Sequence, residues 1–188
     1  MKKVIIIVVT ILFIWFLVLG IFIFPKIVKF MDEFFSSDYS ASTSSEKKIS
    51  ANDFTVYDTY NNKASLSDFT GKPTVVNFWA TWCGYCVREL PYFENSYKEY
   101  GDEVNFLIVD MTDSSRETLG GASDFIRKYA YSFPVYYDLD GSASRAYSVR
   151  SIPMTLFLDK DGNLVYTQHG AMDSTELKYY INDLLENK

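Results

Sequence analysis

The feature that most constrains the fold of this chain is a pair of cysteines placed at the end of an apolar run. Cys83 and Cys86 are the only cysteines, and they follow the largely apolar segment Val75–Trp79 in a Cys-x-x-Cys pattern. A continuous apolar run of this length indicates a strand buried on both faces. Two cysteines at this spacing, on a strand-to-helix turn, can close a small disulfide and open it again. The pattern therefore indicates redox chemistry and not a structural cross-link.

The position of Cys83, just before the expected helix, predicts which sulfur attacks. The thiolate is the nucleophile in disulfide exchange, and a helix N-terminus lowers the pKa of a cysteine below its ordinary value of about 8.5. We therefore expect Cys83 to be the more exposed, lower-pKa attacking sulfur. Cys86, one turn into the helix, should be more buried and should resolve the mixed disulfide by attacking Cys83.

Other uses of a Cys-x-x-Cys pair need residues that this chain lacks. A structural zinc site needs four ligands, and the only histidine is His169, which we expect to be structural or solvent-facing. Haem attachment needs a histidine directly after the second cysteine, where this chain has Val87. Asp159–Asn163 resembles the start of a calcium loop, but Gly170 stands where the glutamate ligand belongs, so we expect a turn. No metal site is expected.

The N-terminus predicts a membrane anchor. An apolar stretch from Val4 to Phe24 follows Lys2 and Lys3, and about twenty such residues in a helix cross the core of a bilayer. A cleaved signal peptide is the alternative, but it would have a shorter apolar region and a small-residue cleavage site, whereas Pro25 follows here. The two lysines favour a cytoplasmic N-terminus. We expect a single-pass cell-membrane protein with its domain on the extracytoplasmic side.

Composition divides the chain into three parts. Residues 1–25 form the predicted transmembrane anchor, 26–50 a juxtamembrane segment with a serine-rich linker, and 51–188 the folded domain. The net charge of -6 argues against nucleic acid as a partner. We expect a monomer.

Within the folded domain, strand-like and helix-like patterns alternate, which indicates an α/β sheet. The expected strands are 54–57, 74–80, 104–110, 134–137, 155–158 and 164–168. The expected helices are 65–69 (a short turn), 84–100, 122–131, 142–147 and 175–185. The last two strands, joined by a hairpin turn, add an antiparallel pair to the sheet.

A family resemblance rests on the segment from Asn77 to Cys86 with Glu89 and Pro91 after it, which is similar to the active-site signature of the thioredoxin superfamily. More closely, the chain resembles the membrane-anchored, extracytoplasmic thiol–disulfide oxidoreductases of the TlpA and ResA type. The likeness covers about 51–188. It implies a thioredoxin-like fold: a central mixed β-sheet flanked by helices, with an N-terminal extension and a helix-strand insertion at about 122–137.

The resemblance also assigns roles to residues outside the cysteine pair. Ile152-Pro153 matches the family's cis-proline, where the backbone at Ile152 pairs with a bound substrate chain. Glu89 matches an acidic residue that tunes cysteine protonation in the ResA-type subgroup. Asn77 stands where ordinary thioredoxins carry a buried aspartate, so Glu89 substitutes for that base. The alternative for Glu89 is a solvated glutamate on the helix surface.

Two aromatic residues flank the expected attacking sulfur. Trp82 precedes Cys83, and Tyr85 lies between the two cysteines, where the family often has proline. We expect both to belong to the substrate-binding surface together with Ile152 and Pro153.

The resemblance implies disulfide exchange with exported cysteine-containing proteins, such as apocytochromes c before haem attachment. A membrane electron-transfer protein would supply the reducing equivalents, and no cofactor is needed beyond the redox-active disulfide. Two alternatives stay open. One is a disulfide oxidase or isomerase, because the intervening pair Gly84-Tyr85 does not fix the redox potential. The other is a copper- or metal-carrying binding module that uses the two thiols as ligands.

Overall fold

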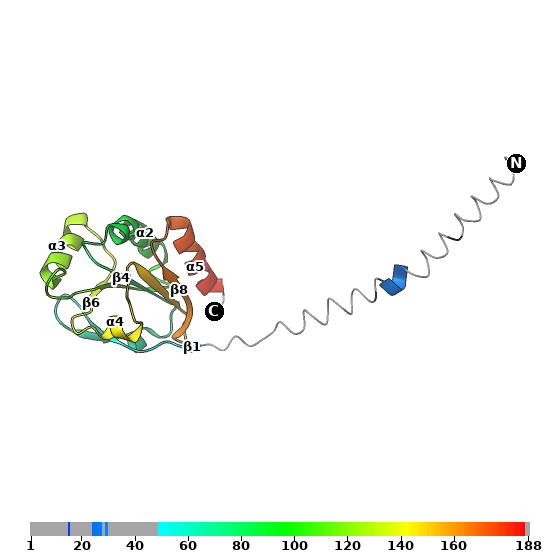
Figure 1. The fold of residues 1–188 in the computed structure, drawn as a ribbon, viewed down its shortest axis with the longest axis horizontal. Helices are drawn as coiled ribbons and strands as arrows, with labels where there is room; N and C mark the ends of the chain where they lie inside the picture. Colours follow the sequence, from blue (N-terminus) through cyan, green and yellow to red (C-terminus); the bar gives the residue numbers. More distant parts are fainter. Residues whose placement is uncertain (1–14, 16–23, 28, 30–48, 187–188) are drawn as a thin grey trace, which may run out of the picture. The chain divides into compact units, whose positions relative to one another are not determined.

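The structure is a computed structural model that describes Trp15, residues 24–27, Lys29 and residues 49–186 (Figure 1). The chain divides into two units, Met1–Lys47 and Lys48–Lys188. The few described residues of the first unit are helical. Most of the predicted anchor and linker lies outside the described residues. Within the part of the chain that the structure describes, no helix combines the length and hydropathy needed to span a bilayer.

Eight strands of the second unit form one mixed sheet. They are β1 (Ile49–Ser50), β2 (Thr55–Tyr57), β3 (Lys63–Ser65), β4 (Thr74–Trp79), β5 (Asn105–Asp110), β6 (Val135–Tyr137), β7 (Met154–Leu158) and β8 (Asn163–His169). Their order in space is β1-β8-β7-β4-β5-β6-β2-β3. The central strand β4 runs parallel to β5 and antiparallel to β7. The last two strands, β7 and β8, pair antiparallel, which confirms the predicted α/β sheet with a late antiparallel pair.

Helices cover both faces of this sheet. They are the 3-10 helix η1 (Leu66–Phe69), α2 (Gly84–Tyr100), α3 (Leu119–Tyr129), α4 (Ser142–Ala146) and α5 (Ser174–Glu186). In Figure 1, α2, α3 and α5 lie on one side of the sheet and α4 on the other. The face under α2 and α5 is the one that carries the cysteine pair.

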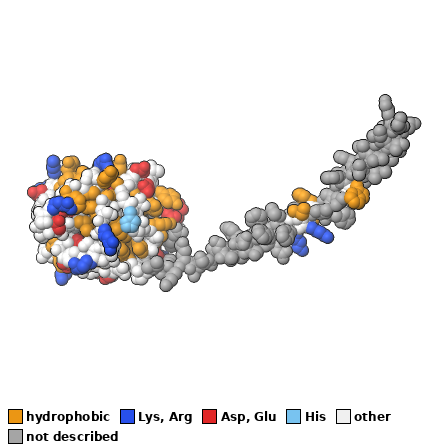
Figure 2. All heavy atoms as spheres, in the orientation of Figure 1, with side chains coloured by type: hydrophobic (Ala, Val, Ile, Leu, Met, Phe, Trp, Pro, Cys, Tyr) orange, Lys and Arg blue, Asp and Glu red, His pale blue; other side chains and the backbone are white. Residues whose placement is uncertain are grey.

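Two hydrophobic cores result from the alternation of side chains along the central strands. Val75 and Trp79 of β4 pack with α2 and α5, whereas Val76 and Phe78 pack in the core beside α4. All six residues of β4 are buried, as predicted for a strand covered on both faces. On the face of the domain drawn in Figure 2, acidic and basic side chains are interspersed with hydrophobic ones.

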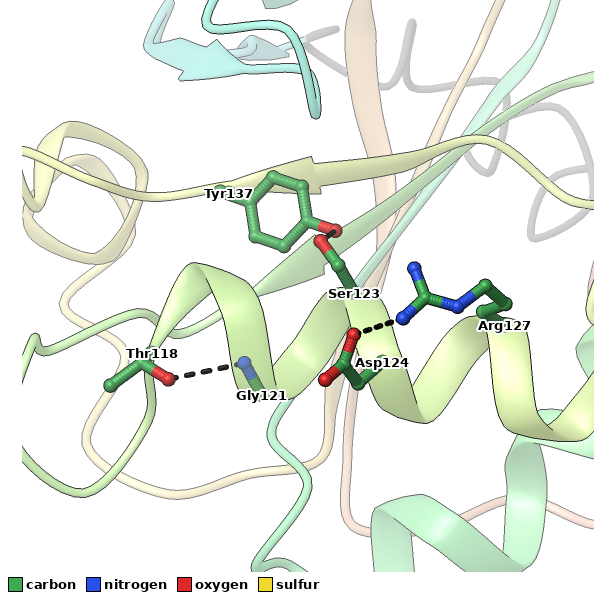
Figure 3. Close-up of polar contacts among 6 residues, drawn as sticks. All are labelled: Thr118, Gly121, Ser123, Asp124, Arg127 and Tyr137. Atoms are coloured by element: carbon green, nitrogen blue, oxygen red, sulfur yellow. Dashed lines mark hydrogen bonds and ion pairs between the residues drawn. The ribbon is translucent and has the colours of Figure 1, made fainter.

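Most predicted elements are present, and their ends differ from the prediction by at most three residues. The largest difference is at α3, which begins at Leu119 and not at residue 122. Its first turn forms in spite of two glycines because the Thr118 side chain accepts a hydrogen bond from the backbone N–H of Gly121 at 3.1 Å (Figure 3). The helix then docks on β6, where the hydroxyls of Ser123 and Tyr137 are 2.8 Å apart (Figure 3).

Two short strands were not predicted. Strand β1 lies at the end of the segment 26–50 that we expected to be linker, and it pairs with β8. Strand β3 begins at Lys63, between the expected strand 54–57 and the expected helical turn 65–69, and pairs with β2. Strands of two or three residues give too short a pattern to separate from a loop. The turn at Asp159–Asn163 is confirmed: the Asp159 carboxylate accepts hydrogen bonds from the backbone N–H groups of Asp161 and Asn163.

Candidate active site

Cys83 and Cys86 form a disulfide at the N-terminus of α2. Cys83 is the N-cap residue, and its sulfur accepts a hydrogen bond from the backbone N–H of Cys86 at 3.2 Å. Cys83 is 6% exposed and Cys86 is fully buried, which is the order expected of an attacking and a resolving sulfur. The N–H group and the helix terminus that face Cys83 would stabilise a thiolate at that position.

The loop before β7 faces the disulfide. The Ile152–Pro153 peptide bond is cis, and the Ile152 carbonyl oxygen lies 3.6 Å from Cys83 Sγ. A disulfide sulfur carries no proton, so this contact is not a hydrogen bond in the oxidised state. A reduced Cys83 thiol would have a proton to donate to the same oxygen. The structure thus brings two predicted substrate-binding residues, Ile152 and Pro153, to the predicted attacking sulfur.

Glu89 lies on α2 one turn after Cys86 and is buried, with 1% of its surface exposed. The alternative of a solvated helix glutamate is therefore wrong. Its Oε1 accepts a hydrogen bond from Asn77 Nδ2 at 2.9 Å, and its Oε2 accepts one from the backbone N–H of Met172 at 3.0 Å. Burial raises the pKa of Glu89 to about 7, although both hydrogen bonds oppose the rise. A carboxyl group that exchanges a proton near neutral pH thus lies one helical turn from Cys86.

A second buried carboxyl group, Asp110, was missed by the sequence analysis. Asp110 ends β5 and is the register partner of Trp79 on β4, so both side chains lie on the sheet face that carries the cysteines. Asp110 Oδ1 accepts a hydrogen bond from the Thr112 hydroxyl at 2.6 Å, whereas Oδ2 has no partner among the described residues. Burial, with a smaller contribution from the nearby charge of Glu117, raises the pKa of Asp110 to about 8, although the Thr112 hydrogen bond opposes the rise. The one sequence signal was an aspartate at the carboxyl end of a buried strand.

Glu117, also missed, holds the turn that carries the active site. The side chain is 1% exposed. Its carboxylate accepts hydrogen bonds from the backbone N–H of Thr81 at 2.9 Å and from the Thr81 hydroxyl at 2.8 Å. Thr81 lies between the end of β4 and Trp82, so this contact fixes the path of the chain into Cys83. Glu117 comes from the loop before α3, in a part of the sequence with no signal for a contact with the cysteine turn.

Replacing Glu117 with alanine is expected to destabilise the oxidised protein by about 1–3 kcal/mol, because the part-buried N–H and hydroxyl of Thr81 lose their acceptor. Urea unfolding of the full chain measures the loss. Glu186→Ala removes an exposed carboxylate at the end of α5 and serves as the matched control. Equal unfolding midpoints for the two variants would show that the Glu117 contact does not hold the turn.

The surface beside the disulfide is aromatic and basic. Trp82 is 42% exposed and Tyr85 is 64% exposed. The Arg116 guanidinium lies 3.5 Å from the centre of the Trp82 ring, and the Arg88 guanidinium lies 4.4 Å from the centre of the Tyr85 ring. A cavity of about 450 Å³ opens here, lined by Trp82, Met111, Asp113, Val149, Arg150, Ser151 and Ile152. Ile152, which is part of this lining, also places its carbonyl oxygen 3.6 Å from Cys83 Sγ, so the cavity lies beside the attacking sulfur.

The remaining candidate residue, His169, is exposed at the end of β8 and is the register partner of Met154, next to Pro153. Among the residues that the structure describes, no group of three or more His, Cys, Asp or Glu side chains is arranged to hold a metal ion.

Solved structures with similar folds show the fold class of the folded domain. StoA from Bacillus subtilis matches with a TM-score of 0.61 and 27% identity, covering 69% of this chain and 96% of StoA. The exposed lipoprotein thioredoxin Etrx1 from Streptococcus pneumoniae strain TIGR4 matches with a TM-score of 0.60 and 32% identity, covering 69% of this chain and 98% of Etrx1. The predicted thioredoxin-like fold is therefore confirmed for the folded domain.

The sequence comparisons narrow this class to a family. The Redoxin family matches residues 46–184. The thiol-disulfide oxidoreductase ResA of Bacillus cereus (strain ATCC 10987 / NRS 248) is 33% identical over 153 residues, which is 78% of this chain and 85% of ResA. The chain belongs to the Redoxin family, and with its Cys83–Cys86 disulfide it is a thiol–disulfide oxidoreductase.

Proposed function

We propose that the chain is a membrane-tethered reductant of exported cysteine-containing proteins. The observation that carries this proposal is the placement of the Cys83 sulfur. It caps α2, receives an N–H bond from Cys86, and lies 3.6 Å from the carbonyl oxygen of Ile152 at the edge of an open cavity. A partner chain that enters this cavity meets both the sulfur and the loop before β7, whose residues line the cavity.

The exchange takes place in two steps. The Cys83 thiolate attacks one sulfur of the partner disulfide, so that a mixed disulfide forms and the other partner sulfur leaves as a thiolate. The Cys86 thiolate then attacks Cys83 Sγ, closes the internal disulfide and releases the second partner sulfur. The partner gains two electrons and two protons, and the Cys83–Cys86 pair loses them. Glu89, with its pKa near neutral, is proposed to take up the proton that Cys86 loses.

Two features support a position outside the cytoplasm. The apolar stretch from Val4 to Phe24 has the length of a bilayer-spanning helix with lysines before it. The similar protein Etrx1 is described as an exposed lipoprotein. A membrane electron-transfer protein is proposed to return electrons to the Cys83–Cys86 disulfide, and the similarity to the thiol-disulfide oxidoreductase ResA supports the exchange activity.

The midpoint potential of the Cys83–Cys86 pair tests the direction of transfer. The full chain is equilibrated with dithiothreitol buffers, alkylated and analysed by mass spectrometry. We expect a value toward the thioredoxin end of the range, near about -270 mV. A value near about -120 mV would instead assign the protein to disulfide formation.

Labelling of intact cells tests the location. A thiol reagent that does not cross membranes is added to cells that express the full chain, after brief reduction. We expect Cys83 to be labelled and the labelled chain to stay in the membrane fraction. Labelling only after lysis, or a chain found in the soluble fraction, would contradict the proposed tether.

A further inference from the structure

Arginine is distributed unevenly over the structure. Of the five arginines in the chain, two are engaged away from the active site. Arg127 forms an ion pair with Asp124 on α3 (Figure 3), and Arg145 donates a hydrogen bond to the carbonyl oxygen of Asp140. The other three form no ion pair with any described residue: Arg88, Arg116 and Arg150.

These three arginines contact residues next to the cysteines or line the cavity beside them, and we call them the arginine rim. Arg116 stacks on Trp82, which precedes Cys83, and Arg88 stacks on Tyr85, which lies between the cysteines. Arg150 lines the cavity beside Trp82 and the loop before β7. All three side chains are exposed. The rim therefore comes from three places in the chain: helix α2, the loop before α3 and the loop before β7.

Two carboxylates lie near the rim, those of Asp113 and Glu117. One carboxylate, that of Asp113, lines the same cavity. Its Oδ1 already accepts hydrogen bonds from the backbone N–H groups of Ser115, Arg116 and Glu117. The Glu117 carboxylate is buried on Thr81 and does not reach the surface. In a chain whose net charge is -6, three exposed arginines thus lie on the aromatic surface and cavity beside the disulfide, against one carboxylate that lines the cavity.

We propose that the arginine rim selects partner segments in which carboxylate side chains flank the reacting cysteine. This inference rests on the proposed disulfide exchange and names the chemical class of its substrates. The planar guanidinium group binds carboxylates through paired hydrogen bonds. Stacking on Trp82 and Tyr85 holds two of the three groups in place before the partner arrives, which lowers the entropy lost on binding. Because the rim is exposed, its charge acts mainly on the encounter with the partner and weakens in salt.

The test uses three synthetic peptides that share one internal disulfide and differ only beside one cysteine, where they carry two glutamates, two glutamines or two lysines. Each peptide is mixed with the reduced full chain in nonionic detergent, and the second-order rate of peptide reduction is measured. We expect the glutamate peptide to react about tenfold faster than the lysine peptide at about 20 mM salt, and the ratio to shrink to about twofold at about 500 mM salt.

Single substitutions test which arginines produce the preference for the glutamate peptide. Arg116→Gln and Arg150→Gln should each lower the ratio of glutamate to lysine rates by about threefold, as expected for single exposed ion pairs. The effect should fall on KM more than on kcat. The matched control is Lys160→Gln, which removes one positive charge in the turn after β7, at the end of that strand away from Cys83. It should leave the ratio unchanged.

The outcomes separate this inference from the function on which it rests. A charge preference that falls in the rim variants and not in Lys160→Gln supports the rim. Equal rates for all three peptides at both salt concentrations would overturn the selectivity and leave the exchange activity standing. Failure to reduce any of the peptides would overturn the proposed function, and the selectivity with it.

Discussion

Replacing Cys83 with serine is expected to lower disulfide exchange to the rate of the buffer thiol alone, whereas replacing Cys86 with serine is expected to trap the partner on Cys83. A serine hydroxyl stays protonated at neutral pH and does not attack a disulfide sulfur at a useful rate. In Cys86→Ser, Cys83 keeps its N-cap position on α2, but no second thiolate is in place to release the bound partner. Intact-protein mass spectrometry after mixing with a disulfide peptide measures the trapped adduct.

Each single variant is the control for the other. Both remove the Cys83–Cys86 disulfide, so a loss of folding would affect them equally, whereas the predicted outcomes differ. Peptide mapping should place the adduct on Cys83. An adduct on Cys86 in the Cys83→Ser variant, or no adduct on either, would contradict the assignment of attacking and resolving sulfurs.

A rise in pH is expected to lower the stability of the folded protein. The oxidised protein is expected to lose roughly 2–5 kcal/mol of unfolding free energy between about pH 5.5 and pH 8.5. The pKa of Glu89 is raised from 4.5 to about 7, and that of Asp110 from 3.8 to about 8, mainly by burial. Their protonated forms are favoured in the folded state, so this stability is fully present below the unfolded pKa values. As the pH rises, the unfolded state ionises first, and the stability is lost up to about pH 7 for Glu89 and pH 8 for Asp110.

Asp110→Asn tests this account most cleanly. The substitution keeps the side-chain shape and the oxygen that accepts from Thr112, and it replaces the unpartnered Oδ2. At about pH 8.5 the unfolding free energy of the variant should exceed that of the parent by roughly 2–3 kcal/mol. Its unfolding free energy should also change less with pH. Urea unfolding of oxidised full chain across the pH range measures both quantities. Glu186→Gln, at the exposed end of α5, should leave the slope unchanged.

A parent stability that is constant or rises over this pH window would contradict the burial of two protonated carboxyl groups. A pH slope that is the same in Asp110→Asn and in the parent would assign the effect to another group.

Much of the fold was predictable because its main elements carry strong local patterns. The bounds of α2 agree with the prediction at both ends, since a cysteine turn precedes the helix and Gly101 follows it. The buried strand β4 was equally clear from its apolar run. By contrast, β1 exists only through its pairing with β8, and the start of α3 depends on the Thr118 cap. Strand pairing is a tertiary contact and a helix cap is the effect of a single residue. Neither changes the spacing of apolar residues from which the elements were predicted.

The parts of the site that consist of residues close together in the sequence could be predicted. The parts that depend on contacts between residues far apart in the sequence could not. The cysteine pair and the Ile152-Pro153 loop were identified from their motifs. Glu89 is held by a hydrogen bond from the backbone N–H of Met172, which lies far along the chain. Asp110 becomes part of the site only through its register with Trp79, and Glu117 only through a contact with Thr81 across an irregular loop. No spacing rule links any of these pairs.

The most direct test of the central claim is the pH dependence of alkylation at Cys83 in the reduced full chain, followed by peptide mass spectrometry. The N-cap position and the N–H group of Cys86 that faces the sulfur predict that Cys83 reacts first. They also predict a midpoint clearly below the ordinary cysteine value of about 8.5. A midpoint at or above that value, or faster modification of Cys86, would contradict the claim that α2 activates Cys83 as the attacking thiolate.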